Sequence, residues 1–212
     1  EIRGYNRLGQ MAEGEVVVLL QDDDKPQPGS GWINQAIKLF NKYPKMGLIG
    51  GYRGRMDNGR KIKPNNCNDG LKYGADPRAD PLRETKTIPY QDRSLGVTFM
   101  FIYKVNMAPM IVRKGVFVKQ GMFNLAFSCP GDGGMGFDFE YSVRMWKEGY
   151  QVGIYDPKMA HRVGDSMKTG THAGKANRVT RVNEKRNNGQ IYKMYPGFHT
   201  RRGTAMAMRA NR

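Results

Sequence analysis

The chain has 212 residues, 39% of them hydrophobic, and a formal net charge of +16. A chain of this length and composition can bury a sizeable core, which excludes disorder throughout. The excess of cations permits binding to phosphates, nucleic acid, anionic lipid or acidic polysaccharide, without choosing among them. No apolar run reaches the roughly 20 residues that a membrane-spanning helix needs, so we expect no such helix.

Two cysteines, Cys67 and Cys129, lie far apart and lack the spacing of metal ligands. Because disulfides are rare in the cytosol, isolated cysteines of this kind indicate free thiols in a reducing compartment. We therefore expect a cytoplasmic protein, either in solution or peripheral to the cytosolic face of a membrane.

The first predicted elements are a helix and a strand. Residues 4–13 carry Leu8, Met11 and Ala12 at helical spacing, which predicts a short helix with these side chains on one face. Residues 16–20 are five consecutive Val and Leu residues, and such a run is typical of a strand buried on both faces. Together they predict an α/β sheet.

Three carboxylates, Asp22, Asp23 and Asp24, follow this strand directly. Ligands of α/β sheets bind at the carboxyl ends of strands, and adjacent acids repel one another unless a cation lies among them. Carboxylate oxygens are ligands that Mg²⁺ and Mn²⁺ prefer. The placement therefore favours a divalent-cation site, although a bare acidic triplet can also be a solvated turn.

The middle of the chain alternates helices and strands around one irregular segment. Segment 53–94 is rich in Asn, Asp, Gly, Pro, Lys and Arg, which predicts a long loop or insertion with a small hairpin. The apolar patterns elsewhere predict a helix capped by Ser30 and strands at 46–52, 97–103 and 150–155.

A glycine-rich segment, 129–136, precedes a predicted helix at 137–148. Asp138 lies in the first turn of this helix, where the helix dipole favours an ionised carboxylate. The local sequence alone favours an acid that only stabilises the helix terminus. Trp32 and Trp146 both fall on apolar helix faces, so we expect them in the core and not as sugar platforms.

A set of short motifs runs along the chain in a fixed order: Asn6-x-x-Gly9-x-x-x-Ala12-x-Gly14-Glu15-Val16-Val17, Leu20-Gln21-Asp22-Asp23-Asp24, Pro28-x-x-x-Trp32, Gly121-Met122-Phe123-Asn124, Asp138-Phe139-Glu140, Arg144 and Gly149-Tyr150. Over residues 4–165 this set resembles the centre of an inverting family 2 glycosyltransferase of the GT-A fold. The resemblance implies an α/β protein with a GT-A type (Rossmann-like) mixed sheet flanked by helices.

The resemblance also implies a division of the chain. Residues 1–165 are expected to form the catalytic region and residues 166–212 a basic C-terminal extension. The family's first, nucleotide-binding strands have no counterpart before Glu1, so we expect a chain that is truncated at its N-terminus. Phe137 stands where the family has Glu, which leaves Asp138 alone of the usual acid pair.

The implied general base is Asp138, which would take the proton of the acceptor hydroxyl. Asp132 and Glu140 are rivals for this role. The implied ligands of Mn²⁺ or Mg²⁺ are Asp24, Asp22 and His161, although a lone histidine is equally often structural. The implied contacts with the nucleotide sugar are Asp22, Asp23, Asn6 and Arg144.

The expected partners are a UDP- or GDP-linked sugar as donor and a glycan, lipid or protein as acceptor. Between Lys158 and Arg212 the only acids are Asp165 and Glu184, so the chain ends in a basic tail. This tail can fold over the diphosphate through Lys168, Lys175 or Arg178, contact an anionic membrane, or remain a solvated extension.

Two other classes of protein stay open on the sequence alone. One is a basic nucleic-acid- or polyanion-binding protein, although no motif interleaves the basic residues with aromatic ones, so we expect no specific nucleic acid. The other is a sugar nucleotidyltransferase of similar α/β build, which would need a glycine-rich phosphate loop near its first strand.

Overall fold

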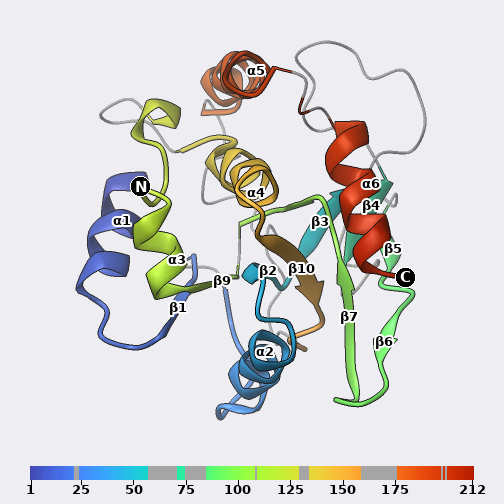
Figure 1. Ribbon diagram of the computed structural model, residues 1–212. Helices are drawn as coiled ribbons and strands as arrows, with labels where there is room; N and C mark the ends of the chain where they lie inside the picture. Colours follow the sequence, from blue (N-terminus) through green and yellow to red (C-terminus); the bar gives the residue numbers. More distant parts are fainter. Residues whose placement is uncertain are drawn as a thin grey trace.

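The computed structural model describes residues 1–21, 24–56, 71–74, 85–107, 109–128, 134–158, 176–196, 198 and 200–212. This part of the chain is a mixed α/β fold, with two sheets and helices packed against them (Figure 1). The mixed sheet flanked by helices is as expected, whereas its assignment to the GT-A type stays a prediction.

Six strands form the larger sheet, in the order β1-β9-β2-β10-β7-β6. They are β1 (Val16–Leu19), β9 (Met110–Arg113), β2 (Met46–Gly50), β10 (Gln151–Tyr155), β7 (Val97–Phe101) and β6 (Gln91–Asp92). Strands β1, β2 and β10 run in one direction, because β9 is antiparallel to both β1 and β2, and β10 is parallel to β2. Strand β7 is antiparallel to β10. The carboxyl ends of β1, β2 and β10 therefore share one edge.

Helices α2 (Gly31–Lys42) and α4 (Phe137–Lys147) cover opposite faces of the sheet around β2 (Figure 1). Every residue of β2 is buried, because both of its faces are covered. Trp32 and Trp146 are buried in the core, as expected. Ser30 precedes α2 at the predicted position, but its side chain makes no capping hydrogen bond.

Strand β1 is not buried on both faces, so that prediction was wrong. Val17 and Leu19 are buried, whereas Val16 and Val18 are only half-buried. The strand lies at the end of the described sheet order, with β9 as its single described neighbour. An outer strand with this alternation has one well-covered face, which a run of apolar letters does not reveal.

The first helix forms close to the predicted residues, but its apolar face is not the face that packs against the core. In α1 (Ile2–Met11), Leu8 and Met11 are 64% and 66% exposed. The helix instead buries Ile2 and Gly9. A Cβ at Gly9 would lie 2.6 Å from the Phe117 ring of α3 (Lys114–Lys119), so the glycine permits close packing of the two helices. An apolar pattern cannot identify a glycine as the contact residue.

The described parts of segment 53–94 contribute strands, so the expectation of a long loop was incomplete. Strands β3 (Arg53–Met56) and β4 (Leu71–Gly74) pair antiparallel, which confirms the hairpin. With β5 (Thr85–Thr87) and β8 (Lys104–Val105) they form a second sheet, ordered β5-β4-β3-β8. Buried positions of these strands are occupied by Lys and Arg. The strands therefore lack the apolar pattern from which a strand is usually predicted.

The described part of the basic tail forms two helices, α5 (Ala176–Met194) and α6 (Thr200–Ala210). A Cβ at Gly203 would lie 1.9 Å from the Tyr103 ring, so α6 packs closely against the core. After α6, the Asn211 side chain exchanges two hydrogen bonds of 2.8 Å with the Phe101 backbone. None of the described helices combines the length and apolar character that crossing a membrane requires.

Candidate functional site

The shared carboxyl edge of the larger sheet is closely packed. Gly51 directly follows β2, and its N–H donates to the Pro109 carbonyl at 3.1 Å. A Cβ at Gly51 would lie 2.6 Å from Pro109, which precedes β9, and 3.0 Å from Pro157, which follows β10. The segments that enter and leave three strands thus meet at this edge, where ligands of α/β sheets bind.

Asp138 lies in the first turn of α4 and is only 8% exposed. The Met107 N–H donates to its Oδ2 at 2.9 Å, and the Phe139 N–H donates to its Oδ1 at 2.9 Å. Burial raises the pKa of Asp138, while these hydrogen bonds and the charge of Arg55 act in the opposite direction. Asp138 is thus a buried carboxylate whose pKa lies above its ordinary value. Each of its two oxygens accepts a hydrogen bond from a backbone N–H.

The strand register relates Asp138 to the acidic triplet. Leu19, at the carboxyl end of β1, pairs with Met110 at the start of β9. Met107, which holds Asp138, precedes Met110 by three residues. Asp138 therefore lies at the sheet edge toward which β1 directs the acids that follow it. Of these, Asp24 is buried, and its Oδ2 accepts the Gln21 N–H at 2.7 Å.

The predicted metal site is not covered by the structure. Asp22, Asp23 and His161 lie outside the described residues, as do Cys67, Cys129, Asp132, Lys168 and Lys175, and the side chain of Arg178 is not described. Within the described ranges, no group of three His, Cys, Asp or Glu residues could hold a metal ion. The assignment of Mn²⁺ or Mg²⁺ to Asp24, Asp22 and His161 stays a prediction.

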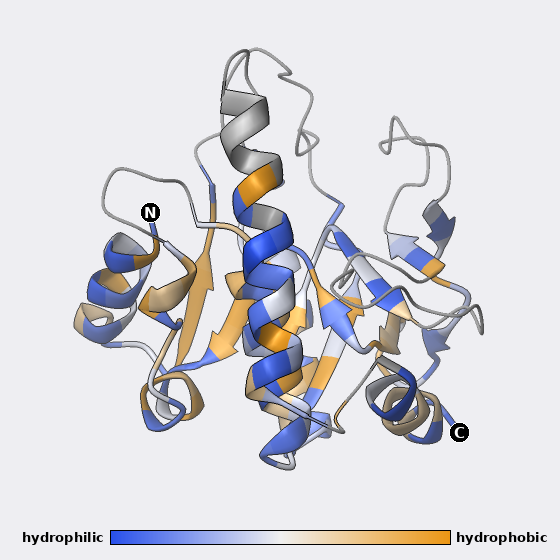
Figure 2. Cartoon of the chain, turned by 90° about the horizontal axis from the view of Figure 1, so that it is seen from above, coloured by the Kyte–Doolittle hydropathy of each residue, from blue (hydrophilic) through white to orange (hydrophobic). Residues whose placement is uncertain are grey.

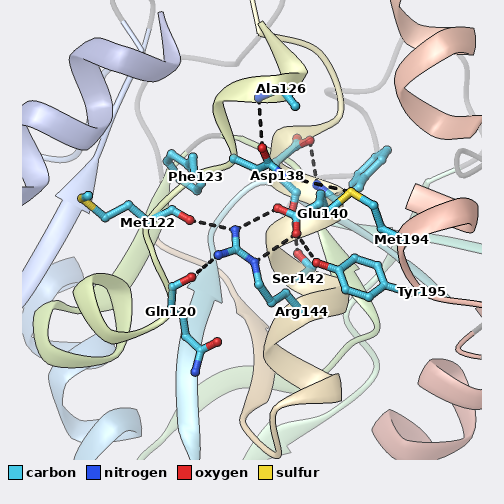
Figure 3. Close-up of polar contacts among 12 residues, drawn as sticks. Gln120, Met122, Phe123, Ala126, Asp138, Glu140, Ser142, Arg144, Met194 and Tyr195 are labelled. Atoms are coloured by element: carbon cyan, nitrogen blue, oxygen red, sulfur yellow. Dashed lines mark hydrogen bonds and ion pairs between the residues drawn. The ribbon is translucent and has the colours of Figure 1, made fainter. Parts of the chain in front are cut away.

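Glu140 and Arg144 form an ion pair on α4, in which Glu140 is buried and Arg144 is partly buried (Figure 3). Arg144 Nε and Nη2 donate to the two Glu140 oxygens at 3.0 and 2.8 Å. The same guanidinium donates to the carbonyls of Gln120 and, at 2.7 Å, Met122. Tyr195 donates its hydroxyl to Glu140 Oε1. Arg144 is therefore committed to holding the turn after α3 against α4.

That turn is built from two residues with left-handed backbone. Gly121 has φ +76° and Met122 has φ +60°. A non-glycine residue in this region costs about 1–2 kcal/mol, so other contacts must hold Met122 there. The bond from Arg144 to the Met122 carbonyl is one such contact. Strained turns of this kind often occur at functional sites.

Asn6 secures the other side of the turn. Its Nδ2 donates to the Phe123 carbonyl at 2.8 Å, and its Oδ1 accepts the Phe123 N–H at 2.9 Å. Asn6 and Arg144 both line a pocket of about 370 Å³ beside the turn, together with residues 121–125, Glu140, Met194 and Tyr195. Their polar groups are engaged in the fold, and their predicted contact with a nucleotide sugar stays a prediction.

Two cations that the sequence analysis did not select lie beside the ring of Phe139, the residue after Asp138. Lys104 Nζ and the Arg55 guanidinium lie 5.0 and 5.4 Å from the centre of the Phe139 ring. In the second sheet, Arg55 of β3 lies opposite Lys72 of β4 on one side and Lys104 of β8 on the other. All three residues are buried. Lys72 and Arg55 fall in the segment that the sequence presents as a loop, and Lys104 directly follows the predicted strand 97–103, so no periodic signal identified them.

Tyr195 was also missed in the sequence analysis. This residue lies in the basic tail, whose composition contains no signal for packing against the core. The spacing of Glu140 and Arg144, i and i+4 on one helix, did contain a signal for their ion pair.

Comparison with known proteins adds no identification: no protein-family model matches this chain, and no curated protein matches it significantly. The fold and the site thus define a mixed α/β protein with a buried carboxylate at the carboxyl edge of its larger sheet.

Proposed function

We propose that this chain is a metal-dependent glycosyltransferase that moves a sugar from a nucleotide-diphosphate sugar to an acceptor hydroxyl with inversion. The observation that carries the proposal is the environment of Asp138. It is a buried carboxylate with a raised pKa, held by two backbone N–H groups at the sheet edge toward which β1 directs its acids. A base with a raised pKa accepts a proton more readily than an ordinary carboxylate.

The proposed reaction assigns one proton transfer to Asp138. The acceptor oxygen attacks the anomeric carbon from the face opposite the diphosphate and forms the new carbon–oxygen bond. The bond between the anomeric carbon and the diphosphate oxygen breaks, and its electron pair stays with that oxygen. The acceptor proton passes to the Asp138 carboxylate. Each Asp138 oxygen receives one N–H, and a carboxylate oxygen has a second lone pair that can accept this proton.

Asp24 fits a role as metal ligand, because it supplies a buried carboxylate just after β1. Carboxylate oxygens suit Mg²⁺ and Mn²⁺, and Asp22 and His161 are the proposed companions. When bound, the metal would neutralise the charge that develops on the departing diphosphate.

Glu140 is the less suitable base. Its two oxygens are hydrogen-bonded to Arg144, and Oε1 also accepts the Tyr195 hydroxyl. A proton on Glu140 would remove the charge that pairs with Arg144 and disturb the hydrogen bonds that hold both of its oxygens. Among the described residues, Asp138 accepts backbone N–H groups, and these bonds persist when the carboxylate is protonated at its second lone pair.

The first test is calorimetric binding of UDP and GDP in the presence of Mn²⁺ or Mg²⁺. We expect binding that disappears when EDTA removes the metal. Equal binding to nucleic acid or heparin with and without metal would instead support a polyanion-binding protein. Formation of a nucleotide sugar from a nucleoside triphosphate and a sugar phosphate would support a nucleotidyltransferase.

The second test is Asp138→Asn. We expect it to reduce sugar transfer by about 10²–10⁴-fold, as loss of a general base does, with binding of metal and UDP or GDP unchanged. Glu148→Gln is the matched control, because it makes the same change on a half-exposed acid directly after α4. Transfer at the wild-type rate in Asp138→Asn would exclude Asp138 as the base.

A further inference from the structure

Helix α5 and Tyr195, which directly follows it, contact the chain on both sides of Asp138. In Figure 1, α5 lies directly over α4, and Figure 2 shows the long helix crossing the molecule with a mostly hydrophilic outer surface. Asn187 of α5 and Tyr195, the residue directly after this helix, reach the start of α4 and the segment before it. The basic tail therefore contributes side chains to the site region.

Asn187 holds the two ends of the segment that precedes α4. The residue is fully buried, and its Nδ2 donates to the Phe127 carbonyl at 3.1 Å and to the Met135 carbonyl at 2.8 Å. Its Oδ1 accepts Arg186 Nε at 3.1 Å, which orients the amide with its N–H groups toward both carbonyls. The Met135 N–H donates to the Phe127 carbonyl at 3.3 Å, so the two ends also touch directly.

This attachment lies next to the residue that starts α4. Gly136, two residues before Asp138, has φ +76°, and a Cβ there would lie 3.5 Å from Asn188 and 3.9 Å from Asn187. Tyr195 binds Glu140, two residues after Asp138. Asn187 thus binds the backbone before the proposed base, and Tyr195 binds a side chain after it.

We propose that Asn187 is a positioning residue for Asp138, and that α5 belongs to the catalytic region and is not an appended tail. This inference rests on the proposed function. Because Gly136 is glycine and tolerates many backbone conformations, the start of α4 depends on outside contacts for its direction. Misplacing a catalytic group by about 1 Å can reduce a rate by 10²-fold.

The test compares Asn187→Ala and Asn187→Asp with the control Asn211→Ala in the full chain. Asn211 also makes two hydrogen bonds to one stretch of backbone, at Phe101, away from α4. Hydrogen exchange is measured on peptides that span residues 127–139. Turnover is followed as release of UDP or GDP from a nucleotide sugar that the wild type uses, well below the unfolding midpoint of every variant.

We expect both Asn187 variants to exchange at least tenfold faster at residues 127–139, with kcat lowered by about 10–100-fold and the donor KM unchanged. Asn187→Asp is expected to be the worse, because a carboxylate would face two carbonyls. Asn211→Ala should keep wild-type exchange in these peptides and wild-type kcat.

Unchanged exchange at residues 127–139 in Asn187→Ala would overturn the inference, as would faster exchange with wild-type kcat. If the wild type releases no nucleotide from any nucleotide sugar, the proposed function fails. The exchange comparison then decides on its own whether Asn187 holds the segment that carries Asp138.

Discussion

Two buried tyrosines beside the Glu140–Arg144 pair differ in their hydrogen bonding. Tyr195 donates to Glu140, whereas the Tyr141 hydroxyl has no hydrogen-bond partner among the described residues. Burial raises the pKa of both hydroxyls, so both are neutral at physiological pH. The Tyr141 ring packs edge-on against Phe117 and Phe123. Its contribution to the core comes from the ring and not from the hydroxyl.

Tyr141→Phe is therefore expected to raise the free energy of unfolding by about 1 kcal/mol, because it removes a buried hydroxyl without a partner. Tyr195→Phe is the matched control and should lower the same quantity by about 2 kcal/mol, since it removes a hydrogen bond to a charged group. Urea unfolding of both variants measures these changes. A loss of stability in Tyr141→Phe would mean that its hydroxyl has a hydrogen-bond partner.

At the level of elements, one carboxylate joins the end of α2 to β6. Asp92 accepts Lys42 Nζ at 2.6 and 2.7 Å, the Tyr43 hydroxyl at 2.6 Å, and the Ser94 hydroxyl at 2.8 Å. Burial alone would raise the pKa of Asp92, but these hydrogen bonds and the Leu95 N–H outweigh it and hold the pKa well below its ordinary value. Folding therefore favours the ionised form of Asp92.

A group whose pKa is lower in the folded state stabilises the fold above its unfolded pKa, which is about 3.9 for Asp. This stabilisation is lost as the pH falls below that value toward the folded pKa. We expect Asp92→Asn to lower the free energy of unfolding by about 2 kcal/mol at pH 7. The difference from wild type should shrink steadily as the pH falls below about 4.

Urea unfolding at a series of pH values measures this difference, with Glu148→Gln as control. Glu148 is half exposed, and its oxygen lies 3.9 Å from Lys147 Nζ, so its replacement should change stability little at any pH. A difference between Asp92→Asn and wild type that does not vary with pH would contradict a native state stabilised by ionised Asp92.

At the scale of the whole molecule, the sequence predicted the parts of the fold that alternate apolar helices and strands. Strands β2, β7 and β10 and helices α2 and α4 lie where their patterns indicated. The sequence failed where a contact depends on an unexpected residue type. Gly9 packs α1 closely against α3 while the apolar Leu8 and Met11 are exposed, and buried Arg55 and Lys104 form strands where apolar residues are usual.

The sequence predicted only those features of the candidate site that depend on residues close together in the chain. Asp138 falls in the first turn of its helix as expected, because helix termini have local signals. Arg55 comes from β3 and Met107 from the segment between β8 and β9. Asn187 and Tyr195 come from the basic tail, whose composition did not decide between packing and solvation. Contacts between distant segments follow from strand order and helix packing, which local patterns do not determine.

The net charge of +16 should make the stability of the fold depend on salt concentration. Like charges on a compact molecule repel one another, and added salt screens this repulsion once the Debye length falls to about 8–10 Å. Relief of as little as about 1 kcal/mol raises the Tm of a chain of this size by about 2–4 °C. We therefore expect the Tm to rise between 10 mM and 150 mM NaCl, as measured by calorimetry.

Lys185 and Lys193 are exposed on α5 and allow a matched test of this cause. The double variant Lys185→Glu and Lys193→Glu lowers the net charge by four, so its Tm at 10 mM NaCl should exceed that of wild type. Its increase in Tm with salt should be smaller, because less repulsion remains to be screened. A Tm that falls with salt would show that attractive surface pairs, and not net repulsion, dominate the electrostatics of the fold.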